Sequence, residues 1–143
     1  MITGIGHTAY RVRDLDASLG FYCGILGMRE MFRLHRDTGK VWLVYLRVDD
    51  STYVELFPGG EERVEITPRS CAYMHLCLTV DDIQATVREL SSRGLEVVGE
   101  PKQGQDGNWQ YWVTDPDGNR IELMQMMPDS LQAKAVAALR KGG

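Results

Sequence analysis

The second half of this sequence restates the first half at several marked positions. His7, Val12 and Asp14 recur 68 positions later, and the tripeptide Val-Glu-Leu at residues 54–56 recurs 67 positions later as Ile-Glu-Leu. An internal repeat of this kind indicates a supersecondary unit that occurs twice. One copy alone cannot bury a sheet, so we expect the two copies to pack side by side.

Alternating and helical spacings predict the same order of elements in both copies: a strand, a helix and three strands. In the first copy, strands are expected at residues 5–12, 28–34, 41–48 and 52–57, with a helix from Asp14 or Asp16 to about Leu26. In the second copy, strands are expected at residues 73–80, 96–100, 109–114 and 119–125, with a helix that Asp81 caps and that runs through Arg93. Gly27 and Gly94 end the two helices. The predicted fold class is α+β.

The repeat also predicts the domain organisation, which is a single domain over residues 1–143. Module 1 is expected at about residues 4–60, a charged linker at about 61–72 and module 2 at about 73–127. A short C-terminal helix is expected at about residues 129–141, with Ser130 as its N-cap. The apolar side of this helix packs either on the sheet or on a partner subunit, and the sequence leaves both open.

Composition and charge argue against several classes of protein. The formal net charge is −4 and the Lys and Arg residues are scattered, whereas a nucleic-acid surface needs a basic stripe. No apolar run approaches the roughly 20 residues of a membrane span, and the first residues lack the segments of a signal peptide. Cys23, Cys71 and Cys77 show no CxxC spacing, which indicates reduced thiols. We therefore expect a cytoplasmic protein that binds neither nucleic acid nor membranes.

Glu122 is the most unusual residue of the predicted strands. It follows a turn at residues 115–119 and stands between Ile121 and Leu123. An ionised carboxylate that faces a protein interior costs several kcal/mol unless it is paired or bound to a metal. The repeat supplies such partners, because each module has one His on its first strand and one Glu on its last. The two sets are His7 with Glu55, and His75 with Glu122.

Alternate residues of a strand share a face, so Glu55 and Glu122 are expected on the concave side of the sheet, away from the helices. Two modules related by pseudo-twofold symmetry would bring two imidazoles and two carboxylates together. This donor set suits a divalent ion such as Zn, Ni, Co, Mn or Fe(II), and a six-coordinate ion would keep two positions for water or substrate. Taken singly, a His in a strand is usually hydrogen-bonded and a Glu usually lies on a solvated face. The placement of all four residues on the repeat favours the metal site.

Four segments carry a family resemblance: GHTAYRVRDLDASLGFYCGILGM, YVELF, YMHLCLTVDDI and DPDGNRIELM. Along residues 4–125 they resemble the vicinal-oxygen-chelate superfamily, which includes glyoxalase I, extradiol dioxygenases, methylmalonyl-CoA epimerase, and fosfomycin and bleomycin resistance proteins. The likeness is closest to glyoxalase I, a lactoylglutathione lyase. It implies two tandem βαβββ modules that form a cupped mixed sheet, a homodimer, and a divalent metal ion with His7, Glu55, His75 and Glu122 as its ligands.

One subsite departs from glyoxalase I. After the Glu-Leu pair of the first module, that family usually continues with Thr and, two residues later, with an Asn that helps to hold glutathione. This chain has Phe57, Pro58 and Gly59 instead. Arg11 matches a family arginine that contacts the glutathione carboxylate. The resemblance therefore implies a metal site and leaves open whether glutathione or another thiol is used.

The implied chemistry is proton transfer next to a carbonyl group through a metal-stabilised enediolate. Glu122 is the preferred base, because the resemblance implies that the second-module Glu can leave the metal when substrate arrives; Glu55 is its symmetric rival. The inner-face neighbours of these residues are expected to line the substrate site: Ala9, Arg11, Tyr53, Phe57, Cys77, Thr79, Arg120 and Met124. Among them, Arg11 is expected to meet an anionic group of the substrate. Trp42, Trp109 and Trp112 are expected in the core or in a dimer interface.

Three functions are consistent with these residues. The first is a lyase or isomerase of glyoxalase I type, which acts on a small molecule such as a 2-oxoaldehyde–thiol hemithioacetal or a related 2-hydroxycarbonyl compound. The second is another metalloenzyme of the superfamily, namely a dioxygenase, an epimerase or a thiol transferase of the resistance type. The third is a non-catalytic protein that binds a small molecule. The presence of all four ligand residues favours the first.

Overall fold

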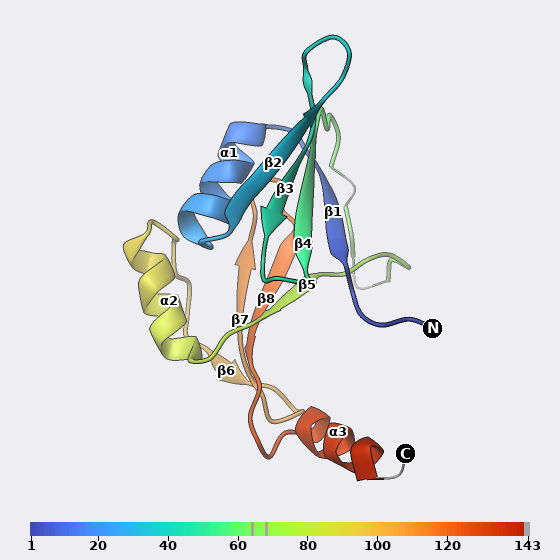
Figure 1. The fold of residues 1–143 in the computed structure, drawn as a ribbon. Helices are drawn as coiled ribbons and strands as arrows, with labels where there is room; N and C mark the ends of the chain where they lie inside the picture. Colours follow the sequence, from blue (N-terminus) through green and yellow to red (C-terminus); the bar gives the residue numbers. More distant parts are fainter. Residues whose placement is uncertain (64, 68, 142–143) are drawn as a thin grey trace. The chain divides into compact units, whose positions relative to one another are not determined.

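A computed structural model describes residues 1–63, 65–67 and 69–141 of the chain. The chain forms two compact units, the first made of Met1–Met74 with Asp115–Asn119 and the second of His75–Thr114 with Arg120–Gly143. Each unit holds one four-stranded sheet with both parallel and antiparallel pairs. The fold is α+β with two βαβββ repeats, which confirms the predicted fold class (Figure 1).

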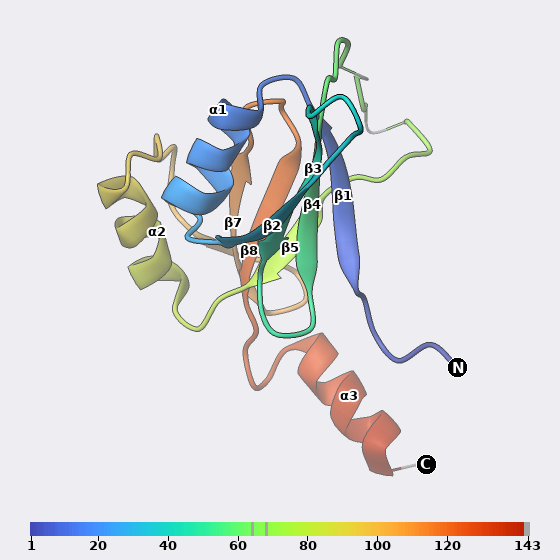
Figure 2. The same ribbon diagram turned by 45° about the horizontal axis from the view of Figure 1, so that its top comes forward.

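Unit 1 contains the sheet of the first repeat. Its elements are β1 (His7–Val12), α1 (Leu15–Leu19), the π-helical segment η1 (Gly20–Ile25), β2 (Arg29–His35), β3 (Val41–Arg47) and β4 (Tyr53–Pro58). The strand order is β1-β4-β3-β2, in which β1 runs parallel to β4 and the other neighbours are antiparallel. α1 and η1 lie along one face of this sheet (Figures 1 and 2).

The core of unit 1 lies between this helical layer and the sheet. Aliphatic side chains at alternate strand positions are buried there: Val12, Val44, Leu46, Val54 and Leu56. Phe21 and Tyr22 of η1 are buried as well. Because successive strand residues point to opposite faces, Glu55 faces away from the helical layer. One face of the sheet is thus packed, and the other is left for polar groups.

The first helix begins as predicted but changes its type. The Asp14 carboxylate accepts hydrogen bonds from two backbone N–H groups of the first turn, which makes Asp14 the N-cap. The α-helix ends at Leu19 and continues as η1, where the Leu26 N–H donates to the carbonyl oxygen of Phe21. Gly27 then adopts a φ of 77°, a left-handed conformation that favours glycine and ends the helix as predicted.

Unit 2 repeats this topology strand for strand. Its elements are β5 (Leu76–Thr79), α2 (Ile83–Ser92), β6 (Lys102–Gln103), β7 (Trp109–Thr114), β8 (Arg120–Gln125) and α3 (Leu131–Lys141). The strand order is β5-β8-β7-β6, with β5 parallel to β8 and the other neighbours antiparallel. The core of unit 2 includes Ile83, Val87 and Leu90 of α2 and Ile121 and Leu123 of β8.

Two predictions for unit 2 are wrong in their details. Asp82, rather than Asp81, caps α2, because the Asp82 side chain accepts a hydrogen bond from the Ala85 N–H. Residues 96–100, all of which the structure describes, form no strand, and the edge strand β6 begins only after Pro101. Proline has no N–H for a ladder hydrogen bond, so this segment is poorly suited to extend β6.

The first strand of each repeat is shorter than predicted. The strand expected from residue 5 begins at His7, and the strand expected from residue 73 begins at Leu76. His75 therefore directly precedes β5, whereas the sequence had placed it within a strand.

The turn at residues 115–119 packs within unit 1. The buried Asp115 carboxylate accepts hydrogen bonds from the backbone N–H groups of Asp117 and Asn119, and one from the Tyr22 hydroxyl at 2.9 Å. Arg13 adds an ion pair to Asp117 at 2.8 Å. Burial and the neighbouring Asp115 charge raise the pKa of Tyr22, so its hydroxyl keeps its proton and remains a donor.

α3 is anchored at its start and exposed along its length. The Ser130 hydroxyl accepts a hydrogen bond from the Ala133 N–H, so Ser130 is the predicted N-cap. No side chain of α3 over Leu131–Lys141 is buried. Of the predicted linker at residues 61–72, positions 64 and 68 lie outside the described residues, and the rest forms neither helix nor strand. No helix in the described part of the chain is both long and apolar enough to cross a membrane.

Candidate functional site

His7 and Glu55 form a pair on the face of the unit 1 sheet that lies away from α1. His7 is the first residue of β1, and Glu55 lies in the middle of the neighbouring parallel strand β4. The His7 Nε2 atom lies 3.4 Å from Glu55 Oε2. The Glu55 side chain is only 8% exposed, whereas that of His7 is 49% exposed. A buried carboxylate thus meets an accessible imidazole.

His75 and Glu122 form the equivalent pair in unit 2. The His75 Nε2 atom lies 3.2 Å from Glu122 Oε2, and the two side chains are 34% and 9% exposed. Glu122 lies in the middle of β8, between the buried residues Ile121 and Leu123. The structure therefore brings together the members of each predicted set within a unit. We refer to the two sets as the His–Glu pairs.

Each buried glutamate has a second polar neighbour, and this neighbour differs between the units. In unit 1, Tyr45 of β3 is in register with Glu55, and the hydrogen bond from its hydroxyl to Glu55 raises the pKa of Tyr45. In unit 2, Cys77 of β5 is in register with Glu122. Burial, the Glu122 charge and the thiol's hydrogen bond to Glu122 raise the pKa of Cys77 to about 11. The neighbour is thus a phenol at Glu55 and a thiol, the weaker donor, at Glu122.

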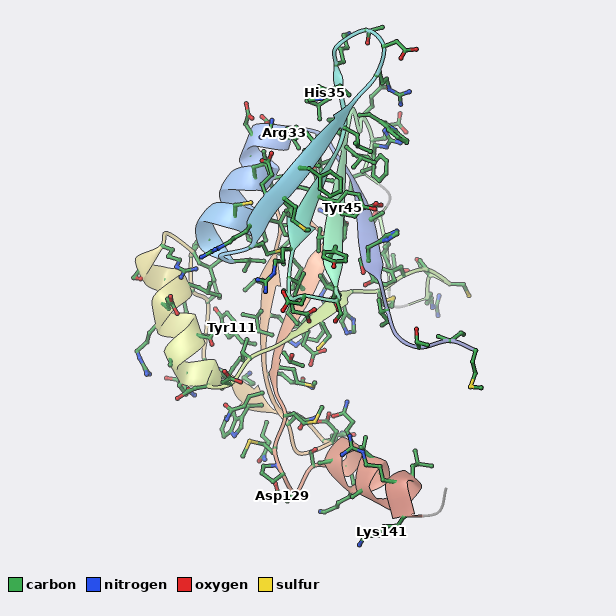
Figure 3. The ribbon with its side chains drawn as sticks, viewed as in Figure 1. Arg33, His35, Tyr45, Tyr111, Asp129 and Lys141 are labelled. Carbon is green, nitrogen blue, oxygen red and sulfur yellow. The ribbon has the colours of Figure 1, made fainter. Side chains whose placement is uncertain are left out.

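Aromatic contacts fix the Tyr45 ring on β3, where Figure 3 labels it. Phe32 of β2 stacks on the ring at a centroid distance of 4.6 Å. His7 and Tyr53 each present an edge contact to it at 6.3 Å. Tyr45 therefore contacts both members of the first His–Glu pair, one through its hydroxyl and one through its ring.

Trp112 takes the corresponding place beside the second His–Glu pair. It is in register with Glu122 across β7 and β8, and its ring lies edge-on to His75 at a centroid distance of 4.8 Å. The Arg120 guanidinium lies 4.3 Å from the centroid of the same indole. At 37% exposure, Trp112 is a surface residue of unit 2 and not part of its core.

Arg11 is bound largely by its own module. Its Nη1 atom donates to the Pro58 carbonyl oxygen at 3.1 Å, and its guanidinium lies 5.7 Å from the Phe57 ring centroid. Trp42 in turn meets Phe57 edge-on at 6.2 Å. This cluster lies on β1, β3 and β4 at the end of the sheet where these strands reach Val12 and Pro58.

The predicted site residues fall into one group in each unit. Unit 1 holds His7, Ala9, Arg11, Tyr53, Glu55 and Phe57, and unit 2 holds His75, Cys77, Thr79, Arg120, Glu122 and Met124. Within unit 1, the Tyr53 hydroxyl donates to the Asp50 carbonyl oxygen. Within unit 2, Met124 is buried and Thr79 is exposed at the end of β5.

Tyr45 was not among the site residues predicted from the sequence, and Trp112 was expected in the core or in a dimer interface. The two residues lie 67 positions apart, the same offset that relates Glu55 to Glu122. Extending the repeat to the third strand of each module would have marked both as equivalent positions. Their contacts with His7 and His75 depend on the strand register, which the repeat alone does not supply.

Each His–Glu pair offers one imidazole nitrogen and one carboxylate oxygen that face each other. Among residues 1–63, 65–67 and 69–141, no three His, Cys, Asp or Glu side chains are arranged to hold a metal ion. One pair provides two donors, and a tight site for a first-row divalent ion needs three or four protein ligands. The donors of each pair, an imidazole nitrogen and a carboxylate oxygen, are of the kinds that bind such an ion.

Comparison with known proteins gives three findings. A family model described as the Glyoxalase/Bleomycin resistance protein/Dioxygenase superfamily matches residues 4–123. The "Probable lactoylglutathione lyase" of Synechocystis sp. is 34% identical over 124 residues, which cover 83% of this chain and 92% of that relative. The "Lactoylglutathione lyase" of Haemophilus influenzae is also 34% identical over 124 residues, which cover 83% of this chain and 90% of that relative.

A solved structure shows the same likeness in three dimensions. The glyoxalase I of Leishmania major, described as trypanothione-dependent, aligns with a TM-score of 0.70 and 28% sequence identity. The alignment covers 98% of this chain and 97% of that chain. The likeness therefore extends over both units and is not confined to one repeat.

Proposed function

This chain belongs to the Glyoxalase/Bleomycin resistance protein/Dioxygenase superfamily, and on that premise we propose that it is a metal-dependent lyase of glyoxalase I type. The observation that carries the proposal is the occurrence, once in each repeat, of a buried glutamate that faces an imidazole at 3.2–3.4 Å. The relatives named lactoylglutathione lyase, at 34% identity, support the reaction class.

The proposed ligands of the metal are His7, Glu55, His75 and Glu122. When bound, a divalent ion (Zn, Ni, Co, Mn or Fe(II)) stabilises the negative charge that develops on the substrate oxygen atoms during an isomerisation. The two carboxylates also offset the charge of such an ion, so that a neutral site results. The proposed active form is a homodimer, as the resemblance to glyoxalase I implies.

Glu122 is the proposed general base. The reaction requires a group that removes a proton from the carbon next to a carbonyl and returns it to the neighbouring carbon. Such a base must move, and Glu122 is held by the weak Cys77 donor, whereas Glu55 is held by the Tyr45 hydroxyl. This difference supports Glu122 as the base and Glu55 as the firmly held ligand.

The proposed substrate is the adduct of a 2-oxoaldehyde with a thiol. The identity of the thiol is a separate question, because Phe57 and Gly59 stand where glyoxalase I usually has a Thr and an Asn, and that Asn helps to hold glutathione. Phe57 is engaged with Arg11 and Trp42, which makes this end of unit 1 aromatic. We therefore expect a thiol other than glutathione to be accepted at least as well.

The test is an isomerase assay with methylglyoxal and either glutathione or a second small thiol, run on protein loaded with each divalent ion in turn. Wild-type protein is expected to form the 2-hydroxyacyl thioester. Glu122→Gln keeps the shape of the side chain and removes both the base and one proposed metal ligand, so a loss of at least about 100-fold in kcat is expected even with metal supplied in excess. Glu96→Gln, at an exposed position outside both pairs, serves as the matched control and is expected to retain activity.

An inactive wild-type protein that nevertheless binds metal would overturn the proposed reaction. Oxygen consumption with Fe(II), or thiol transfer to an antibiotic with Mn, would then assign the chain to another enzyme class of the superfamily. Equal activity of Glu122→Gln and wild type would retain the reaction and overturn the role of Glu122.

A further inference from the structure

We propose that Arg120 forms an anion subsite beside the second His–Glu pair, and that the substrate carries a carboxylate group that this arginine binds. The inference rests on the proposed function, because the reacting end of the substrate is taken to lie at the His–Glu pairs. It also assigns the anion to Arg120 in place of Arg11, which the sequence had favoured.

Position along β8 places Arg120 close to the pair. Arg120 is the first residue of β8 and lies two positions before Glu122, so both side chains project from the same face of the strand. Two strand residues span roughly 6.6 Å. A carboxylate bound at Arg120 would therefore lie only a few bonds from a carbonyl group bound at the pair.

Trp112 holds the Arg120 guanidinium in place. The guanidinium carbon lies 4.3 Å from the indole centroid, well within the range of a cation–π contact, and tryptophan is the strongest partner for such a contact. The same indole meets the His75 ring at 4.8 Å, so a single residue contacts both the arginine and the pair. A guanidinium that lies against a ring keeps its N–H groups in its own plane, where they can donate to two oxygen atoms of a carboxylate.

Four arginines of unit 1 are already engaged. Arg11 donates to the Pro58 carbonyl, Arg13 pairs with Asp117, Arg33 with Glu30 and Arg47 with Asp50. For Arg120, by contrast, no acidic partner lies within ion-pair distance in the part of the chain that the structure describes. An exposed guanidinium that a ring orients and that no carboxylate neutralises is preorganised to bind an anion.

The charge of the surroundings favours a carboxylate over a phosphate. In the described strands of unit 2, the basic residues are Arg120 and Lys102, and Lys102 lies on the edge strand β6. One guanidinium balances the single charge of a carboxylate, whereas a phosphate dianion would leave one charge unmatched next to Glu122. The inferred substrate is thus a 2-oxoaldehyde adduct or 2-hydroxycarbonyl compound with a nearby carboxylate.

Three hydroxamates test the inference by isothermal titration of the metal-loaded protein. A hydroxamate chelates a divalent ion through two oxygen atoms, as the reacting end of the substrate would. Acetohydroxamate carries no further charge, succinate monohydroxamate adds a carboxylate, and 3-phosphonopropanohydroxamate adds a phosphonate. Wild-type protein is expected to bind the carboxylate compound about tenfold or more tightly than acetohydroxamate, and the phosphonate less tightly than the carboxylate.

Arg120→Met keeps an unbranched apolar stem and removes the guanidinium and its charge, so it is expected to erase this preference and leave acetohydroxamate binding intact. Arg88→Met, on the exposed side of α2, is the matched control and is expected to keep the preference. A preference that survives in Arg120→Met would overturn the proposal. A preference that Arg11→Met alone abolishes would also overturn it and assign the anion to Arg11.

A second measurement separates this inference from the proposed function. If the protein takes up no metal, the proposed function fails, and the hydroxamates cannot be compared. The indole N–H resonance of Trp112, assigned from its absence in Trp112→Phe, is then followed while succinate is added to the protein as purified. A saturable shift that Arg120→Met removes would support the anion subsite independently of any metal, and an unmoved resonance would overturn it.

Discussion

The two glutamates of the His–Glu pairs occupy equivalent positions in the repeat but differ in the group beside them. Tyr45 is in register with Glu55 and Cys77 with Glu122, and each glutamate raises the pKa of its neighbour. Buried carboxylates need such partners, because their desolvation is otherwise not compensated. The pairs themselves were predicted from the repeat. Their second partners were not, because a partner across a strand depends on register.

Tyr45→Phe tests the role of the Tyr45 hydroxyl at the first pair. The substitution keeps the ring that stacks on Phe32 and removes the hydrogen bond to Glu55. Groups that orient metal ligands typically contribute 10- to 100-fold to metal affinity, so a loss of about that size is expected in a metal titration. Tyr53→Phe is the matched control, because the Tyr53 hydroxyl donates to the Asp50 carbonyl and not to Glu55. Equal losses in both variants would contradict this role.

The raised pKa of Cys77 predicts how its reactivity depends on pH. The pKa rises from 9.0 to about 11, so the thiol of metal-free protein remains protonated at pH 9, where an ordinary thiol is half ionised. Alkylation of Cys77 by iodoacetamide, followed by mass spectrometry, is expected to accelerate only toward pH 11. In Glu122→Gln, which lacks the nearby charge, the acceleration is expected at lower pH. An alkylation rate of wild-type Cys77 that already rises around pH 9, as for an ordinary thiol, would contradict the raised pKa.

At the scale of single elements, the N-cap of α2 gives a direct test of the corrected helix start. Asp82→Ala removes the hydrogen bond to the Ala85 N–H and is expected to lower the free energy of unfolding by about 1 kcal/mol in urea denaturation. Asp81→Ala is the control and is expected to change stability much less. A larger loss of stability in Asp81→Ala than in Asp82→Ala would instead support Asp81 as the N-cap of α2, as predicted from the sequence.

The elements that the sequence predicted well are those with strong periodicity and clear end signals. The strands β7 and β8, the helix α3 and the start of α1 fall within one or two residues of their predicted bounds. The failures have local physical reasons. Residues 96–100 contain apolar residues but precede Pro101, and the change to a π-helix in η1 depends on a shift of backbone hydrogen bonds that side-chain spacing does not reveal.

For the whole molecule, the internal repeat was the informative feature. It predicted two equivalent units, each with one buried glutamate opposite one histidine, and the structure contains both. The repeat could not indicate where the halves differ. Arg120 and Tyr53 occupy equivalent positions, as do Cys77 and Ala9, and these differences place a guanidinium and a thiol beside the second His–Glu pair.

The central claim is that the His–Glu pairs bind a divalent metal ion, and elemental analysis of the purified protein tests it most directly. Wild-type protein, His75→Ala, Glu122→Gln and His7→Ala would be prepared identically, with His35→Ala as the matched histidine control on the exposed end of β2. We predict about one ion per chain in wild type and in His35→Ala, and a large loss in the other three variants. Wild-type protein that holds no metal and takes up none from added Ni, Zn, Co or Mn would contradict the claim, as would variants of the pairs that retain their metal.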